Sequence, residues 1–194
     1  MKRQFFFLLE FSEWPELQVF RPPAAYIGAM DEMPVLQQLL AYEHIRQLAY
    51  RYALCLDSRD LDSLVALFVK DVKVGPGLSG HEALRGSFED ALRILGTTIL
   101  SVSNHVIELA DDGQSATGSV YCSAEIEQGE DWLRQRILYR DRYFLEHGHW
   151  KFVGRQHLLW YSAPIGVDPR TLELANWPES NIGLGSLPGE FHQN

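Results

Sequence analysis

The stretch YRYALCLDSRDLDSL, residues 50–64, decides the fold of this chain. It predicts the end of one amphipathic helix, a short break at Ser58–Asp60, and the start of a second helix. Asp57 stands at that break, directly after apolar Cys55 and Leu56. A carboxylate at the C-terminal end of a helix is unfavourable with respect to the helix dipole. We therefore expect Asp57 to have a specific partner elsewhere in the fold.

Helical spacing of apolar residues extends on both sides of this break. The spacing predicts a first helix over 36–56, a second over 61–68 with Asp60 as its N-cap, and a third over 81–95. Beyond residue 98 the apolar period changes from helical spacing to alternation. The chain is thus predicted to place its helices before the main part of its sheet.

The alternating segments predict strands over 100–109, 114–127, 132–146 and 150–162, preceded by a short strand at 71–74. Short turns at Asp111–Gly113 and around His147–Gly148 join the long segments into an antiparallel meander. We expect an α+β domain over 35–165, with three helices packed on one side of a curved sheet. Residues 1–34 are expected to be a loosely ordered N-terminal extension, and 166–194 an irregular tail.

The composition excludes several classes of partner. The 194 residues carry 26 acidic and 17 basic side chains, a formal charge of −9, whereas nucleic acid and anionic membranes select basic surfaces. The apolar run Phe5–Leu9 is too short for a secretory signal. Cys55 and Cys122 match no metal or redox spacing and are expected to be buried thiols in a reducing compartment. We expect a cytoplasmic protein with no membrane and no nucleic-acid partner.

Two motifs fail on inspection, so no cofactor and no metal are expected. The stretch GPGLSG, residues 75–80, matches a dinucleotide-binding pattern in letters only, because antiparallel strands follow it and Pro76 removes a backbone N–H. His147 and His149 flank a hairpin turn, and His157 follows in the next strand, with no converging carboxylate expected.

One group of residues is compatible with acid–base catalysis. His105, in the first long strand, is the candidate partner for Asp57, because a carboxylate beside a histidine fixes its tautomer and makes it a general base. Tyr52, five residues before Asp57, could bind an oxygen of a substrate. From these residues alone, a buried histidine with a purely structural hydrogen bond is an open alternative.

The chain resembles a known family over about residues 36–165. HIRQLAYRYALCLDSRDLDSLVALFVKDV, residues 44–72, is similar to the signature opening of the SnoaL-like branch of the nuclear-transport-factor-like cone fold. GHEALRG, SNHVIELADDGQSATGSVY and RYFLEHGHWKFVGRQHLLW resemble later family features in the same order. The resemblance implies a cone-shaped α+β barrel with a closed apolar pocket.

The resemblance is greatest to members that pair an Asp with a His: scytalone dehydratase, hexachlorocyclohexane dehydrochlorinase and bile-acid 7α-dehydratase. It implies a cofactor-free lyase, of dehydratase or dehydrohalogenase type, with catalytic His105, Asp57 and Tyr52. The substrate would be a small apolar or aromatic cyclic molecule. The residues expected to contact it are Asn104, Tyr121, Tyr139 and Trp160.

Arg155 and His157 are weaker site candidates, since surface polar residues are common on strands. The resemblance also implies a homo-oligomer, with a trimer favoured over a dimer, and the apolar face of residues 116–126 would suit its interface. Two alternatives stay open. The same fold serves as a non-catalytic ligand-binding or assembly module, like the small subunit of ring-hydroxylating dioxygenases, and it also serves polyketide cyclases and isomerases.

Overall fold

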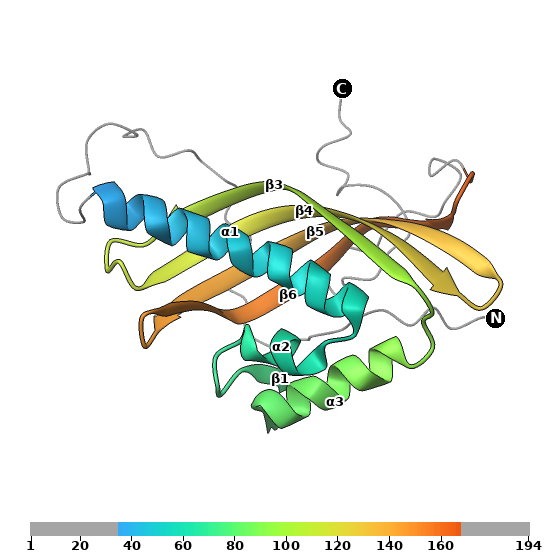
Figure 1. Ribbon diagram of the computed structural model, residues 1–194, viewed down its shortest axis with the longest axis horizontal. Helices are drawn as coiled ribbons and strands as arrows, with labels where there is room; N and C mark the ends of the chain where they lie inside the picture. Colours follow the sequence, from blue (N-terminus) through green and yellow to red (C-terminus); the bar gives the residue numbers. More distant parts are fainter. Residues whose placement is uncertain (1–34, 168–194) are drawn as a thin grey trace.

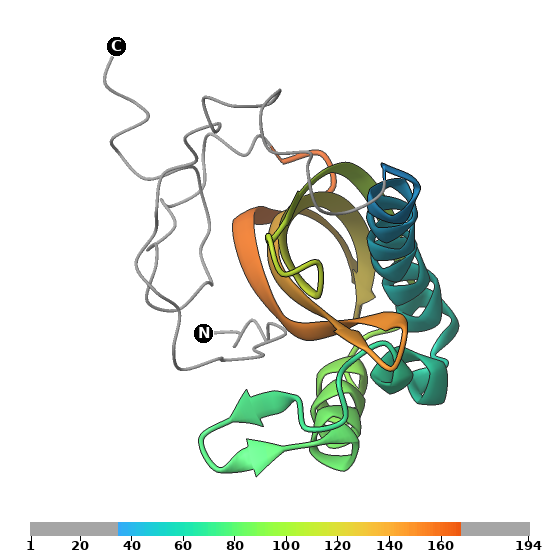
Figure 2. The ribbon, with the colours of Figure 1, turned by 90° about the vertical axis from the view of Figure 1, so that its left-hand side faces the viewer.

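A computed structural model describes residues 35–167 of the chain. The predicted extension 1–34 and nearly all of the predicted tail 166–194 lie outside the described residues. The described part has a four-stranded antiparallel sheet that curls into a cone. One long helix lies along the open side of this sheet, and shorter elements close one end (Figures 1 and 2).

Three helices precede the long strands, as predicted. They are α1 (Val35–Ser58), α2 (Leu61–Ala66) and α3 (His81–Leu92). Between α2 and α3 lies a small hairpin, β1 (Lys73–Gly75) and β2 (Leu78–Ser79), where a single short strand and a loop were expected. The Asp60 carboxylate caps α2 by accepting a hydrogen bond from the Ser63 N–H at 3.0 Å.

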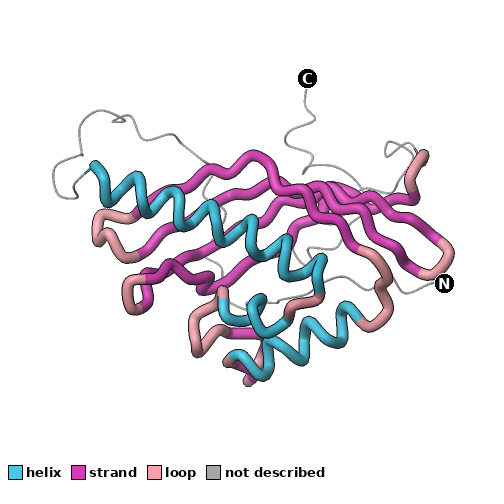
Figure 3. The backbone as a smooth tube through the Cα atoms, in the orientation of Figure 1, coloured by secondary structure: helices cyan, strands magenta, loops and turns pink. Residues whose placement is uncertain are grey.

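The four long strands form the predicted meander. They are β3 (Thr98–Leu109), β4 (Ser115–Gln128), β5 (Asp131–Glu146) and β6 (His149–Pro164), hydrogen-bonded in that order (Figure 3). The β5–β6 turn needs positive φ at both central residues, and His147 (49°) and Gly148 (79°) supply it. Each long strand therefore pairs with the strand that follows it in the sequence.

The helix α1 lies across the concave face of the sheet and contacts β3 and β6 (Figure 2). Its buried side chains recur at helical spacing: Ala41, Ile45, Leu48, Ala49, Tyr52, Ala53 and Leu56. The segment after α2 is tied to β6 by the hydrogen bonds Val69 N–H to Phe152 O and Phe152 N–H to Leu67 O, both 2.9 Å. The core therefore lies between α1 and the concave face.

The strand β4 corrects one expectation from the sequence. Its apolar face, which was expected to pack on another copy, is buried inside the cone: Ala116, Val120, Cys122, Ala124 and Ile126 are all 6% exposed or less. The opposite face, with Thr117 and Tyr121, is on the outside. The prediction was wrong because the core of the same chain, not a second subunit, buries the small-residue face.

Candidate functional site

Asp57 lies in the last turn of α1 and fastens this helix to β3. Its two carboxylate oxygens accept hydrogen bonds from the Thr98 hydroxyl and from the Leu100 backbone N–H, each at 3.0 Å. These bonds offset the unfavourable position of a carboxylate at a helix C-terminus. The partner expected for Asp57 exists, but it is a backbone N–H and a hydroxyl.

Arg59 reinforces the same junction. This residue has positive φ (61°), and its guanidinium donates to the Leu56 carbonyl at 2.6 Å and to the Thr98 hydroxyl at 2.8 Å. It also donates to the Gly96 carbonyl. Thr98 thus accepts from Arg59 and donates to Asp57, so that the residues between α1 and α2 are bonded to the start of β3.

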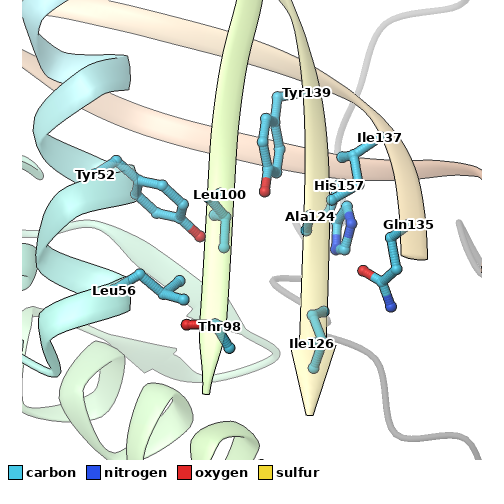
Figure 4. A pocket seen from close by; sticks show the side chains of 10 residues that line it. All are labelled: Tyr52, Leu56, Thr98, Leu100, Ala124, Ile126, Gln135, Ile137, Tyr139 and His157. Atoms are coloured by element: carbon cyan, nitrogen blue, oxygen red, sulfur yellow. The ribbon is translucent and has the colours of Figure 1, made fainter. Parts of the chain in front are cut away.

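A cleft opens beside this junction, between α1 and the concave face (Figure 4). Most of its lining is apolar, with Leu56, Leu100 and Ile126 among the side chains; the whole set is Tyr52, Leu56, Thr98, Leu100, Ala124, Ile126, Gln135, Ile137, Tyr139 and His157. Tyr52 enters from α1 and points toward β3, as Figure 4 shows. The part enclosed by side chains has room for little more than a water molecule.

The two tyrosines of the cleft are phenol donors. Burial raises the pKa of Tyr52 to about 12, and burial raises that of Tyr139 well above its usual value. Both hydroxyls therefore stay protonated at neutral pH. The Tyr52 ring lies edge-on to Phe68, Phe88, Tyr139 and Phe152, with centroid distances of 6.0–6.4 Å. Packing fixes the direction of this side chain.

His105 is held in a different part of the cone. Its Nε2 lies 3.1 Å from the Tyr143 hydroxyl, and that hydroxyl donates to Asp141 Oδ2 at 2.7 Å. The Arg155 guanidinium donates to both oxygens of Asp141, at 2.8 and 2.7 Å. Gly118 leaves space for this chain of bonds, because a Cβ there would lie 3.0 Å from Tyr143 and 3.2 Å from His105 Nε2.

Proton counting along this buried chain assigns the tautomer of His105. The single proton of the Tyr143 hydroxyl goes to Asp141, so the Tyr143 oxygen can only accept from His105. His105 therefore carries its proton on Nε2 and keeps a lone pair on Nδ1, an atom that is buried with no hydrogen-bond partner among the described residues. Burial lowers the pKa of His105 to about 4, which keeps the ring neutral at pH 7.

Asp141 and Arg155 form a fully buried ion pair. Both side chains are 1% exposed or less. Burial alone would lower the pKa of Arg155, but the Asp141 carboxylate beside it raises this pKa above its usual value. The guanidinium also lies 4.3–4.5 Å from the ring centroids of Tyr52, Tyr139 and Phe152. Attraction to these ring faces partly compensates the loss of water around the cation.

The structure does not bring His105 and Asp57 into a hydrogen bond, and that predicted pair is therefore wrong as a contact. The β3 residue bonded to Asp57 is Leu100, five residues before His105 and about 15 Å from it along a strand. Between Val102 and His105 the register with β4 shifts by one residue. This bulge turns His105 toward the concave face, where it faces Tyr143 and Asp141. His105 does not line the cleft.

The predicted substrate contacts divide between the two faces of the sheet. Tyr139 lines the cleft. Tyr121 and Trp160 stack on each other with centroids 6.0 Å apart, and Tyr121 is 40% exposed on the outer face. Asn104 is exposed at the β3 bulge. Tyr121, Trp160 and Asn104 were expected to line the cleft, and this prediction was wrong, because they lie on the outer surface.

Asp141 was not predicted from the sequence, and Arg155 was only a weaker site candidate. A signal was present, because Asp141 occupies an inward position between Tyr139 and Tyr143 in the alternation of β5. A carboxylate at such a position is uncommon unless it is paired. Among residues 35–167, no three or more His, Cys, Asp or Glu side chains converge as metal ligands. None of the helices in this range is both long and apolar enough to span a bilayer.

Comparisons with known proteins agree with this architecture. A SnoaL-like domain profile matches residues 37–156. A search of curated proteins finds no match. Among solved structures, a candidate scytalone dehydratase from Novosphingobium aromaticivorans DSM 12444 superposes with a TM-score of 0.59 at 21% identity, over 70% of this chain and 94% of that one.

Two further structures show the breadth of the fold. Hexachlorocyclohexane dehydrochlorinase LinA-type3 from Novosphingobium barchaimii LL02 has a TM-score of 0.60 at 19% identity, over 68% of this chain and 94% of that one. A protein of unknown function with a cystatin-like fold from Nostoc punctiforme PCC 73102 has a TM-score of 0.53 at 24% identity, over 66% and 94%. Likeness at these identities establishes the fold alone. Since the profile covers more than half of its length, the chain belongs to the SnoaL-like domain family.

Proposed function

We propose that this protein binds a small, largely apolar cyclic molecule in the cleft between α1 and the sheet. The observation that carries the proposal is the pairing of an apolar lining with the two phenols of Tyr52 and Tyr139. Ligand sites are commonly apolar with a few polar groups that orient the ligand. Since both phenols keep their protons, they favour a ligand that presents a hydrogen-bond acceptor, such as a carbonyl oxygen.

Binding requires local movement, since the enclosed space is small. Leu100 is half-buried at the cleft, while Tyr52 is held by four aromatic neighbours. A cyclic ligand would therefore displace Leu100 more easily than Tyr52. On this proposal the protein is a ligand-binding member of the family, and Asp57 has a structural role beside the cleft.

Catalysis by elimination is a second candidate, favoured by the assigned tautomer of His105. An imidazole with a free Nδ1 lone pair and an Nε2–H bonded toward a carboxylate is arranged as a general base. The lyase that the resemblance implies is thus proposed in a revised form, with Tyr143 and Asp141 orienting His105 in place of Asp57. It ranks second because His105 does not line the cleft and its low pKa makes it a weak base.

A matched pair of variants on β3 tests the binding proposal. Leu100→Trp fills the cleft, whereas Ile99→Trp adds the same ring one residue away on the outer face, where Ile99 is 48% exposed. We expect titration calorimetry with 1-tetralone, a bicyclic ketone, to show binding to the wild type and to Ile99→Trp but not to Leu100→Trp. Equal binding by both variants would refute the cleft as the site.

Two further measurements sharpen the assignment. Tetralin, which lacks the carbonyl, should bind more weakly than 1-tetralone to the wild type, and Tyr52→Phe should reduce that difference. Exchange of the α-protons of 1-tetralone in deuterated buffer, followed by NMR, reports proton abstraction from carbon. Exchange faster than in buffer alone, if it is lost in His105→Gln, would favour the lyase. Exchange no faster than in buffer would leave ligand binding as the function.

The oligomeric state stays a prediction. The expected homo-oligomer, with a trimer favoured, is tested by multi-angle light scattering of the full chain. The interface cannot be the small-residue face of β4, because that face is buried in the core of the chain itself.

A further inference from the structure

The outer face of β5 carries a row of arginines. Arg134, Arg136, Arg140 and Arg142 all point away from the core, because the alternate residues Gln135 to Tyr143 are buried. Leu138 completes the row, which we call the arginine stripe. Neighbouring members of the stripe are spaced about 7 Å apart along the strand. This concentration of positive charge is unusual in a chain with a formal charge of −9.

Two members of the stripe have no charged residue directly opposite on the adjacent strands. Arg134 pairs with Glu125 at 3.1 Å. On β4, the residues opposite Arg136 and Arg140 are Ser123 and Ser119, and on β6 they are Tyr161 and Gln156. None of these four carries a charge. The residues opposite them therefore do not balance the positive charge of Arg136 and Arg140.

Arg140 is the member of the stripe whose charge has the least favourable surroundings. Its side chain is half-buried, its Nε has no hydrogen-bond partner among the described residues, and burial lowers its pKa. A partly desolvated guanidinium without a carboxylate costs free energy. An anionic group placed over the stripe would remove that cost.

Aromatic side chains flank the stripe. Tyr121 stacks on Trp160 beside it, and Trp132 and Phe144 are each at least 40% exposed at its two ends. Arginine combined with Tyr, Trp and Phe is the composition that distinguishes protein interfaces from ordinary surface. The surface thus suits an occupant that is both acidic and aromatic.

The chain itself contains a segment with that chemistry, outside the described residues. LLEFSEWPELQVF, residues 8–20, has Glu10, Glu13 and Glu16 and no basic residue. Each glutamate is followed by an apolar residue, in order Phe11, Trp14 and Leu17. The segment therefore carries both acidic and aromatic side chains, the two kinds that the stripe and its aromatic flanks would attract.

The tether is long enough for this segment to reach the stripe. Fourteen residues separate Phe20 from the start of α1 at Val35. When extended they span up to about 50 Å, whereas a four-stranded sheet is about 20 Å wide. A tethered segment has an effective concentration in the millimolar range, so that weak complementarity suffices.

We propose that residues 8–20 of the same chain bind along the arginine stripe of the outer face, with their glutamates on the arginines and their aromatic residues beside Tyr121 and Trp160. The bound segment would cover the most basic part of the sheet. Charge complementarity favours this occupant over a second copy of the sheet face, which would bring arginine against arginine when β5 meets β5.

Glutamyl endopeptidase tests the proposal on the full chain, because it cuts after Glu10, Glu13 and Glu16. Mass spectrometry would give the rate of cleavage after each. We expect Arg136→Glu/Arg140→Glu to raise cleavage after Glu13 and Glu16 by about tenfold or more, since a tethered contact is lost. The control, Arg51→Glu/Lys73→Glu, makes the same change in net charge at exposed sites of α1 and β1 and should leave the rate unchanged.

A charge exchange separates a specific contact from general loosening. Adding Glu10→Arg/Glu13→Arg to Arg136→Glu/Arg140→Glu should restore protection of the bond after Glu16. If the stripe variant fails to fold, 0.5 M sodium chloride with the wild-type chain serves instead and should raise its cleavage rate.

Two outcomes would overturn the proposal. One is equally fast cleavage in the wild type, the stripe variant and the control. The other is protection of the wild type that disappears on dilution, which would assign the contact to a second copy of the chain.

Discussion

Asp57 and Asp141 are both carboxylates of the cone interior or its edge, yet the structure holds them in different ways. Asp57 fastens a helix end to a strand with a hydroxyl and a backbone N–H. Asp141 is enclosed at the centre of the sheet with a guanidinium and a phenol. Position in the fold decides this: partly exposed Asp57 satisfies itself with neutral donors, whereas buried Asp141 needs a positive charge. An Asp and a His that are paired from their residue types alone therefore need not form a catalytic pair.

Breaking the buried ion pair should have the largest effect. Asp141→Asn leaves the Arg155 guanidinium buried without a counter-charge, and we expect a loss of about 3–5 kcal/mol in the free energy of unfolding. Urea denaturation measures it. The double variant Asp141→Leu/Arg155→Met removes both charges and should lose much less. Equal losses in the single and double variants would show that packing, and not the unpaired charge, dominates.

Removing the junction carboxylate should cost less. Asp57→Ala deletes two charge-assisted hydrogen bonds at a partly buried site, and we expect a loss of about 2 kcal/mol. Asp71→Ala, at an exposed aspartate after α2, is the control and should change stability by less than about 0.5 kcal/mol. The same urea experiment compares them. If ligand binding survives in Asp57→Ala, its part in the cleft is structural.

Much of the fold could be predicted because local patterns determine it. The alternation in β5 matches the burial of Leu133 to Tyr143 without a break, and that in β4 matches the burial of Ala116 to Ile126 except at half-buried Gly118. The site was harder, because the bulge in β3 changes which residues face inward. The sequence carries a sign of it: Leu100 and Val102 are in one phase of the alternation, and Ile107 and Leu109 are in the other.

The partners of Asp57 could not be predicted from residue types. Any backbone N–H can satisfy a carboxylate, so only three-dimensional geometry selects Leu100 over a histidine. Inward positions of charged residues were the better guide. The sequence places Asp141 between Tyr139 and Tyr143 in the alternation of β5, and Arg155 stands opposite Asp141 in the β5–β6 register.

Gly118 offers an intermediate test, because it borders the network around Asp141. A Cβ at this position lies 3.0 Å from the Tyr143 ring and hydroxyl, so Gly118→Ala should push that side chain and cost about 1–2 kcal/mol. Gly86→Ala in α3 is the matched control, since a Cβ there meets no atom within 4 Å and alanine favours the helix. We therefore expect Gly118→Ala to lower the thermal midpoint and Gly86→Ala to raise it. A neutral Gly118→Ala would mean that Tyr143 is not fixed by its neighbours.

The smallest effect concerns the proton on His105. Its pKa of about 4 in the folded state lies below the ordinary 6.5, so between these values the unfolded chain binds a proton that the folded chain does not. Stability linked to His105 is therefore fully present above pH 6.5 and is lost as the pH falls toward 4. His105→Gln cannot take up this proton, and its urea midpoint should fall less between pH 7 and pH 4.5 than that of the wild type. His149→Gln, at the exposed β5–β6 turn, should keep the wild-type slope. Parallel slopes for all three proteins would instead show that burial does not lower the pKa of His105.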